Sequence, residues 1–350
     1  MFIKNKLSAL FASASLCFCM TMQAGAELAG CETVANVQGI CGFPAPEDID
    51  VFSGGQYLLF SPVTGVNGTE LESLYLFDVH TLVASPISYQ TASNKEQWGD
   101  ARCIDAPGEK FSPHGIHISQ RSDGRWQVLA VNHLRESVEM FEVAEGKVPS
   151  LIWRGCVLAP EKSNLNDVVA LPDGGFLVSH MFDRGTMEVM AAMQATVNTG
   201  YVWRWQPSSG FEKLPGSDGI VPNGLALTAD GQSLFMSETG GQKIKKINYA
   251  TGQQEGQVKL GPVDNLSWAA DGRLIVTRII GPMPEDCFSK PGPCLAPFQV
   301  LAIDPQTLEY TVLHEQRGKP MGAASIAVVL GDYIYVGSFK GQQILRIKQN

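Results

Sequence analysis

The chain has 350 residues, a net charge of −9, 36 glycines and 20 prolines. It has no basic run that could neutralise phosphates, so we expect no nucleic-acid partner. Long helical apolar patterns are few, and the many turn residues favour short strands. The composition therefore predicts an all-β protein.

The N-terminus indicates a signal peptide over residues 1–26. Lys4 and Lys6 precede an apolar stretch from Leu7 to Met22, and Ala24-Gly25-Ala26 offers a small-residue cleavage site. The alternative is an uncleaved membrane anchor, although the stretch is short for a span. We expect an exported protein, periplasmic or secreted, without a stable membrane anchor, in which residues 27–350 form one domain.

Export makes disulfides the expected state of the cysteines. Loss of Cys17 and Cys19 with the signal leaves six, at positions 31, 41, 103, 156, 287 and 294. An even number in an oxidising compartment indicates disulfide pairing. Cys31–Cys41 and Cys287–Cys294 are the expected local pairs, which leaves Cys103–Cys156. No Cys-x-x-Cys occurs, which argues against a zinc site or a redox motif.

Six strand–turn–strand units recur along the chain. Their turns contain Gly54, Gly124, Gly174, Gly231, Gly272 and Gly331, each between runs of apolar residues. Glycine beside aspartate is typical of hairpin turns, which need positive φ. The spacing is near the ~40–50-residue period of propeller blades. We predict a six-bladed β-propeller; the alternative is a β-sandwich with coincidental turns.

One segment interrupts this pattern in the third unit. Residues Thr186 to Thr196 are rich in methionine and other helix formers. We predict a short helical insertion in blade three. It is either a packed surface helix or a lid over the pocket, where adaptable methionine side chains would suit varied apolar ligands.

The first strand of each unit begins with polar residues. In a propeller these strands line the central channel, so residues at one position of the repeat converge. Carboxylates and carboxamides without cysteine form the oxygen cage that calcium prefers. Asp48 and Asp167 suggest a second, deeper layer. Each residue alone has a structural alternative as a turn or cap; the predicted ring consists of Glu47, His114, Asn166, Asn223 and Asp264-Asn265, with only Ser325 in the sixth unit.

Two histidines of the second unit are candidates for activating a nucleophile. His114 lies at the channel mouth and His133 follows the next strand, so antiparallel pairing can bring them together. A histidine near neutral pKa can deprotonate water while a second orients it or shuttles its proton. The alternative is two structural histidines, and His117 is less suited to act directly. No serine-hydrolase elbow, phosphate-binding glycine loop or His-Glu-x-x-His motif occurs.

Several stretches together carry a family resemblance. They are Pro46-Glu47-Asp48-Ile49, Phe111-Ser112-Pro113-His114-Gly115-Ile116, Leu129-Ala130-Val131-Asn132-His133, Asn166-Asp167-Val168-Val169, Asn223-Gly224, Val263-Asp264-Asn265 and the strands from Gly331 to Ile347. The chain thereby resembles the paraoxonase/arylesterase family of calcium-dependent six-bladed propellers, within the strictosidine synthase-like/gluconolactonase-like superfamily. The resemblance runs from about Glu47 to Ile347.

The resemblance implies a set of roles. A catalytic calcium would be held by Glu47, Asn166, Asn223, Asp264 and Asn265, and a structural calcium by Asp48, Asp167 and the backbone carbonyl of Ile116. His114 and His133 would form a dyad, although Asp264 could itself be the base. His180-Met181-Phe182 resembles the start of the family's active-site insertion. The implied activity is hydrolysis of lactones, with aryl esters as lesser substrates.

The chain also departs from that family. It ends without the C-terminal cysteine that the family ties to its N-terminal region, and it lacks the long apolar N-terminal helix of the animal proteins. Three functions therefore stay open: a calcium-dependent carboxylic ester hydrolase acting on a small lactone or ester, a sugar lactonase of the gluconolactonase type, and a non-catalytic propeller that binds partners.

Overall fold

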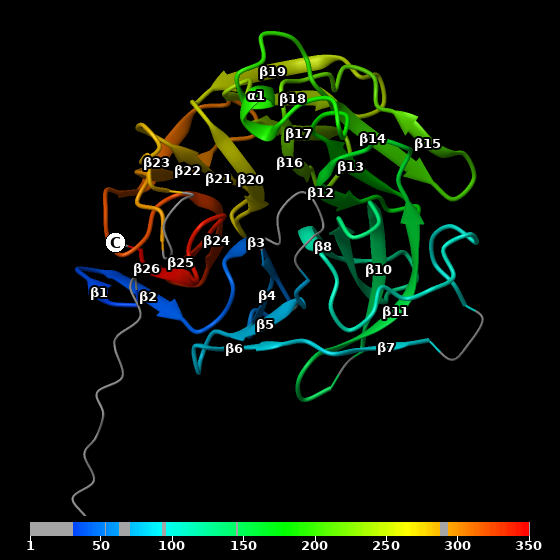
Figure 1. Cartoon of the computed structure of the whole chain (residues 1–350), viewed down its shortest axis with the longest axis horizontal. Coiled ribbons are helices and arrows are strands. Elements are labelled where there is room, and N and C mark those ends of the chain that lie inside the picture. The colour runs from blue at the N-terminus through cyan, green and yellow to red at the C-terminus, as the bar shows by residue number, and fades with distance from the viewer. Residues whose placement is uncertain are drawn as a thin grey trace, which may run out of the picture.

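A computed structural model describes residues 31–52, 54–62, 71–92, 96–144, 146–287 and 293–349. Six sheets surround a central axis, each with its first strand nearest the centre (Figure 1). This arrangement confirms the predicted all-β six-bladed propeller and rejects the sandwich. The predicted signal peptide, residues 1–26, lies outside the described residues and stays a prediction.

The blades follow one another along the chain. Blade one comprises β3 (Pro46–Val51), β4 (Tyr57–Pro62), β5 (Tyr75–Asp78) and β6 (Val83–Pro86). Blade two comprises β8 (Pro113–Gln120), β9 (Trp126–Asn132), β10 (Ser137–Ala144) and β11 (Ser150–Leu158), with β7 (Tyr89–Thr91) added parallel to β11. Blade three comprises β12 (Leu165–Ala170), β13 (Phe176–His180), β14 (Tyr201–Gln206) and β15 (Gly210–Lys213).

The remaining blades complete the ring. Blade four comprises β16 (Pro222–Leu227), β17 (Ser233–Glu238), β18 (Lys243–Asn248) and β19 (Gln254–Lys259). Blade five comprises β20 (Val263–Trp268), β21 (Leu274–Ile279), β22 (Phe298–Ile303) and β23 (Tyr310–Gln316). Blade six comprises β24 (Ala324–Leu330), β25 (Tyr333–Ser338) and β26 (Gln343–Lys348), joined by β2 (Val37–Cys41) and β1 (Thr33–Val34).

Blade six is built from both ends of the described chain. Strand β2 pairs antiparallel with β26, with Val37 opposite Ile347 and Cys41 opposite Gln343. Hydrogen bonding to β2 covers the outer edge of β26, which would otherwise be free to pair with another chain. The ring is therefore closed by a strand that precedes the first blade in sequence.

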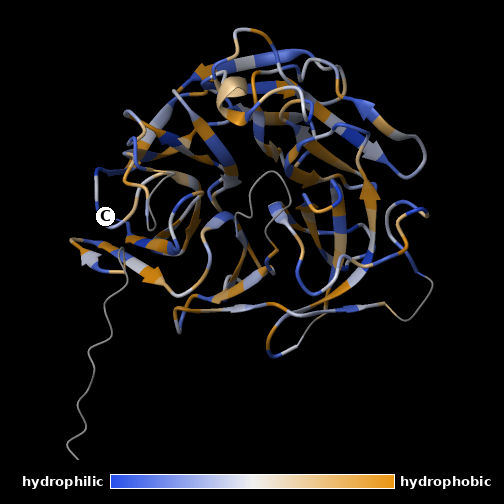
Figure 2. Cartoon of the chain, in the orientation of Figure 1, coloured by the Kyte–Doolittle hydropathy of each residue, from blue (hydrophilic) through white to orange (hydrophobic). Residues whose placement is uncertain are grey.

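The core lies between the blades. An apolar cluster joins each pair of neighbouring blades, and Phe60 and Phe77 of blade one pack with Tyr335 of blade six in one of them. The hydropathy colouring in Figure 2 shows apolar residues concentrated along the strands. Both faces of a blade are covered by its neighbours, so a strand such as β13 is buried along its whole length, with all five of its residues buried.

The predicted insertion is in blade three. Helix α1 (Val189–Met193) lies between β13 and β14 and is shorter than the predicted segment of residues 186–196. Ala192 is buried against Met181, Phe182 and Val221. Within the described part of the chain, no helix is both long and apolar enough to cross a bilayer.

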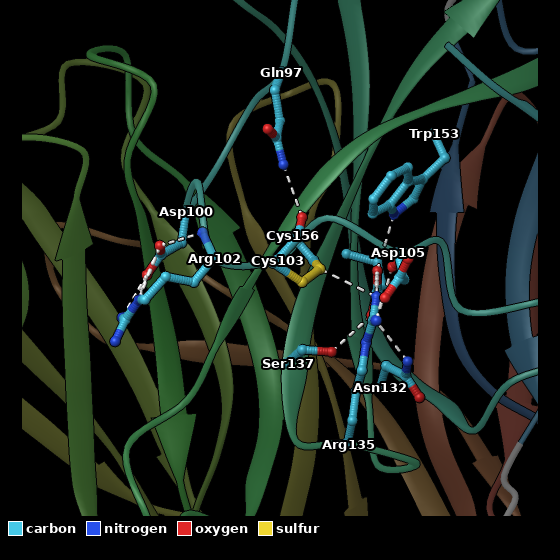
Figure 3. Close-up of a disulfide and its surroundings, with 11 residues drawn as sticks. Gln97, Asp100, Arg102, Cys103, Asp105, Asn132, Arg135, Ser137, Trp153 and Cys156 are labelled. Carbon is cyan, nitrogen blue, oxygen red and sulfur yellow. Dashed lines mark hydrogen bonds and ion pairs between the residues drawn. A yellow bond between two sulfur atoms is a disulfide. The ribbon is translucent and has the colours of Figure 1, made fainter. Parts of the chain in front are cut away.

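All three predicted disulfides are present: Cys31–Cys41, Cys103–Cys156 and Cys287–Cys294. Cys103–Cys156 joins the segment before β8 to strand β11 (Figure 3). Beside it, Arg135 donates to Cys156 Sγ at 3.0 Å and to the buried Glu139 at 2.7 Å. Glu139 also accepts from Asn132, so this network holds the turn that carries His133.

Candidate metal centre and active site

Each inner strand carries a β-bulge at its polar residues. The pairing register shifts by one residue in β3, β8, β12, β16, β20 and β24. A bulge leaves a residue outside the ladder and turns its side chain away from the regular alternation. The displaced positions include Glu47, His114, Asn166-Asp167, Asn223, Asp264-Asn265 and Ser325.

The bulges bring predicted site residues from distant parts of the chain into contact. Asn265 Nδ2 donates to Glu47 Oε1 at 2.9 Å, and Ser325 Oγ donates to the Glu47 carbonyl at 2.6 Å. Glu47 Oε2 lies 3.3 Å from His114 Nε2. Blades one, two, five and six therefore meet around Glu47.

Five oxygens of the predicted ligands are buried without a hydrogen-bond partner. They are Glu47 Oε2, Asn166 Oδ1, Asn223 Oδ1, Asp264 Oδ1 and Asn265 Oδ1. A buried acceptor without a partner costs about 1–3 kcal/mol. One hard cation could satisfy all five, because carboxylate and amide oxygens are calcium ligands. Glu47, Asn166, Asn223, Asp264 and Asn265 therefore fit a calcium ion and are called the oxygen ring below.

The ligand types in the oxygen ring favour one class of metal ion. Two of its members are carboxylates and three are carboxamides. Among the described residues, no group of three or more His, Cys, Asp or Glu side chains forms a metal cluster. A ring rich in amides lowers the charge repulsion between ligands and suits a large, flexibly coordinated cation more than zinc or copper.

Burial perturbs the acids at the axis. Loss of contact with water raises the pKa of Asp264 well above its ordinary value, and the nearby Glu47 carboxylate raises it further. Burial opposes protonation of His114, but the charge of the nearby Glu47 carboxylate outweighs it, so the pKa of His114 is raised. A cluster of this kind gathers negative charge that a cation would stabilise.

The predicted deeper layer is bound by backbone amides. Asp48 accepts from the Ile49 and Ile116 N–H groups at 2.8 and 2.7 Å, so its carboxylate links β3 to β8. Asp167 accepts from the N–H groups of Val168 and Leu225 at 2.7 and 2.6 Å and links β12 to β16. Burial, opposed by these amides, raises the pKa of Asp167 to about 8. Ile116, predicted to contribute its carbonyl, contacts Asp48 through its amide.

The two candidate histidines are in contact. His114 Nδ1 lies 2.7 Å from His133 Nε2, and both side chains are buried. Burial lowers the pKa of His133. His117 lies farther along β8, where its Nδ1 is 3.8 Å from Asp50 Oδ2. His114 is therefore the histidine that reaches both the oxygen ring and the second imidazole.

Several residues at the site escape sequence reasoning. Glu136 Oε1 lies 2.6 Å from His133 Nδ1, and Arg184 contacts the same oxygen at 2.5 Å. Glu136 lies in a turn and Arg184 in the connection between β13 and β14, and neither position carries a repeat signal. Gly115 directly follows His114 and Gly224 directly follows Asn223, and a Cβ on Gly224 would lie 2.6 Å from Asn265 Cα. In the sequence, the His114-Gly115 and Asn223-Gly224 pairs are the only sign that the inner strands approach each other this closely.

Two cavities lie in the described part of the chain, and no residue of the oxygen ring lines either of them. One of about 490 Å³ runs along the inner strands and is lined by Asp48, Asp167, His117 and Trp268 among others. The other, of about 500 Å³, lies beside the insertion and is lined by Asn164, Phe182, Arg184 and residues 185–189. The insertion therefore borders a space large enough for a small molecule.

Comparisons with solved structures support the fold. The chain is similar to a luciferin-regenerating enzyme with 15% identity, covering 89% of this chain and 94% of the other at a TM-score of 0.54. It is similar to a gluconolactonase from Xanthomonas campestris with 13% identity, coverage of 90% and 89% and a TM-score of 0.54. A calcium-binding regucalcin from Agrobacterium tumefaciens has 11% identity, coverage of 88% and 90% and a TM-score of 0.50.

A search of curated proteins finds no match. A family model gives the assignment. The model described as the SMP-30/gluconolactonase/LRE-like region matches residues 69–277, which is more than half of the chain. The matched span includes the inner strands of blades two to five, where His114 and four of the five oxygen-ring residues lie. The chain therefore belongs to the SMP-30/gluconolactonase/LRE-like family.

Proposed function

We propose that the protein is a calcium-dependent hydrolase of lactones and aryl esters. The observation that carries this proposal is the oxygen ring: five buried oxygens without partners beside a buried pair of histidines. Membership of a family named for gluconolactonase supports lactone hydrolysis in general. The resemblance to paraoxonases and arylesterases, with its histidine dyad, supports the narrower choice of substrates.

The oxygen ring would hold the catalytic calcium through Glu47, Asn166, Asn223, Asp264 and Asn265. When bound there, calcium would polarise the substrate carbonyl and stabilise the oxyanion of the transition state. A second, structural calcium is proposed at Asp48, Asp167 and Ile116, where burial first and then the nearby charge of Asp167 raise the pKa of Asp48. The regucalcin neighbour is titled a calcium-binding protein, which agrees with this metal.

The chain's own residues would carry the protons. His114 Nε2 takes a proton from water as the water oxygen bonds to the carbonyl carbon, and His133 keeps the His114 ring oriented through the 2.7 Å contact. The bond between carbonyl carbon and ring oxygen then breaks, and His114 returns the proton to the leaving alkoxide. Asp264 is the alternative base, a role that the family resemblance implies for it.

A sugar lactonase of the gluconolactonase type is the second candidate. The family assignment favours it, and the Xanthomonas campestris neighbour is titled a gluconolactonase. Against it stand the Glu47-Asp48, Asn166-Asp167 and Asp264-Asn265 doublets, which provide more side-chain ligands than that group uses. The third candidate, a non-catalytic binding propeller, predicts that calcium would affect stability alone.

The insertion and the export signal complete the proposal. The cavity beside residues 184–189 supports a lid role for the insertion, with Phe182, Met187 and Val189 against an apolar part of a small-molecule substrate. Disulfides in the described chain agree with export to the periplasm or beyond.

One assay separates the three candidates. Purified protein is tested on aliphatic, acyl-homoserine and sugar lactones and on aryl esters, with calcium and with chelator. We expect turnover of lactones that chelator abolishes and calcium restores. Asp264→Ala should lower kcat/KM at least ~100-fold, because it removes a ligand and the alternative base. Asp271→Ala, at the exposed turn of the same hairpin, is the matched control.

The outcomes are distinct. Preference for sugar lactones would select the second candidate. Full turnover by Asp264→Ala, with its fold verified by circular dichroism, would reject the site. Absence of turnover on every substrate, together with a calcium-dependent rise in melting temperature, would select the binding propeller.

A further inference from the structure

The second histidine of the pair, His133, contacts a carboxylate on its far side. Glu136 Oε1 lies 2.6 Å from His133 Nδ1. Glu136 Oε2 accepts the Leu165 N–H at 2.9 Å, and Arg184 contacts Oε1 at 2.5 Å. A carboxylate that receives an amide and a guanidinium is an acceptor. The proton of this short contact therefore lies on His133 Nδ1.

The proton position on His133 determines the proton position on His114. A neutral His133 with its proton on Nδ1 has a lone pair on Nε2. His133 Nε2 lies 2.7 Å from His114 Nδ1, so the proton of that contact lies on His114. In neutral His114 the lone pair is then on Nε2, the nitrogen 3.3 Å from Glu47 Oε2 and hence beside the oxygen ring.

The backbone of Glu136 indicates that this placement is enforced. Glu136 has φ +46°, in the left-handed region that side chains other than glycine, asparagine and aspartate rarely adopt. Such a conformation costs on the order of 1–3 kcal/mol and persists where surrounding contacts hold it. Glu136 is 9% exposed, and its carbonyl accepts the Ala159 N–H at 2.8 Å. The turn thus holds a buried carboxylate against His133.

We infer that Glu136, anchored by Arg184 of the β13–β14 connection, is a positioning residue that sets the tautomer of both histidines so that His114 Nε2 faces the oxygen ring as a proton acceptor. The inference rests on the proposed hydrolase function for its catalytic meaning, while the proton positions stand on their own. Arg184 also lines the cavity beside the insertion, so one residue contacts both this cavity and the Glu136 carboxylate that holds His133.

The test combines spectroscopy and kinetics on the full mature chain. Protein labelled with ¹⁵N-histidine is measured by two-bond ¹H–¹⁵N correlation, with calcium and with chelator. We expect neutral His114 and His133 protonated on Nδ1 in the calcium form. In Glu136→Gln the amide can donate to His133, so the opposite tautomer should appear. On the best lactone, kcat should fall about 100-fold with KM within twofold, as expected when a base has the wrong tautomer.

Two further variants keep the test decisive. Glu161→Gln removes an exposed carboxylate from the turn after β11 and should match wild type in both measurements. Arg184→Met leaves Glu136 in place and should give a smaller loss of kcat, about threefold to tenfold, should Glu136→Gln not fold.

Protons on Nε2 of either histidine in the wild type, or a kcat within twofold of wild type for Glu136→Gln, would overturn the inference. If no lactone or ester is hydrolysed at all, the proposed function fails, but the tautomer spectra still decide the role of Glu136.

Discussion

Several polar side chains at the propeller axis lower the stability of the fold, because they bury oxygen atoms that have no hydrogen-bond partner. Asn166 and Asn265 are 3% and 1% exposed, and each buries a carbonyl oxygen without a partner. Apolar residues of similar size would remove this cost. Retaining such groups at one ring is understandable if they bind something that the fold alone does not supply. This is the residue-scale reason for favouring a site over a structural role.

His180 offers a residue-scale prediction about pH. Its Nδ1 accepts the Asn164 N–H at 3.1 Å, and burial lowers its pKa below the usual value near 6.5 even though Asp183 opposes this. The folded protein therefore binds fewer protons here than the unfolded chain. The stability this histidine contributes is complete above pH 6.5 and declines as pH falls toward its lower folded pKa.

We therefore expect His180→Gln to lose less unfolding free energy than wild type between pH 7.5 and pH 5, as measured by urea denaturation. His80→Gln, at an exposed position, is the control and should follow wild type. Equal pH dependence in His180→Gln and wild type would show that His180 is not the sensitive group.

At the scale of elements, the decisive device is the bulge repeated in every inner strand. A regular inner strand would point alternate residues toward the two neighbouring blades, where apolar clusters lie. The bulge allows two adjacent polar residues, such as Asp264 and Asn265, to leave the apolar alternation together. It also brings inner strands so close that Gly115 and Gly224 are required.

Gly224→Ala tests this closeness. The added Cβ would lie 2.6 Å from Asn265 Cα and 2.9 Å from the Asp264 carbonyl, so β16 and β20 must separate. We expect a loss of about 1–3 kcal/mol in unfolding free energy and weaker calcium binding by isothermal titration calorimetry. Gly146→Ala, where the nearest atom would be 3.3 Å away on an exposed loop, is the control. Unchanged calcium affinity in Gly224→Ala would show that the close packing at Gly224 does not affect the calcium site.

At the scale of the whole molecule, closure of the ring and covalent links limit how far the blades can move. Strand β2 completes blade six, and apolar clusters seal each boundary between blades. Cys103–Cys156 spans 53 residues and thus constrains a long stretch of the unfolded chain. Because ring residues come from different blades, their geometry depends on this closure.

Replacing Cys103 and Cys156 together by serine should cost about 2–4 kcal/mol in unfolding free energy, measured by urea denaturation, mainly by freeing the unfolded chain. The matched double variant at Cys287 and Cys294, whose sequence separation is 7, should cost less because it closes a shorter loop. An equal or larger loss in the second variant would contradict this explanation.

The sequence by itself determined the propeller, the order of its inner strands, the disulfide pairs and the residues Glu47, His114, Asn166, Asn223 and Asp264-Asn265 as one repeating set. Those features are local: turn glycines, strand alternation and polar pairs in phase with a repeat. Only the tertiary structure decided that β2 closes blade six, that α1 spans five residues, and that Glu136 and Arg184 meet His133. These contacts join segments outside the repeat, and no periodic signal encodes which loop reaches which neighbour once the blades pack.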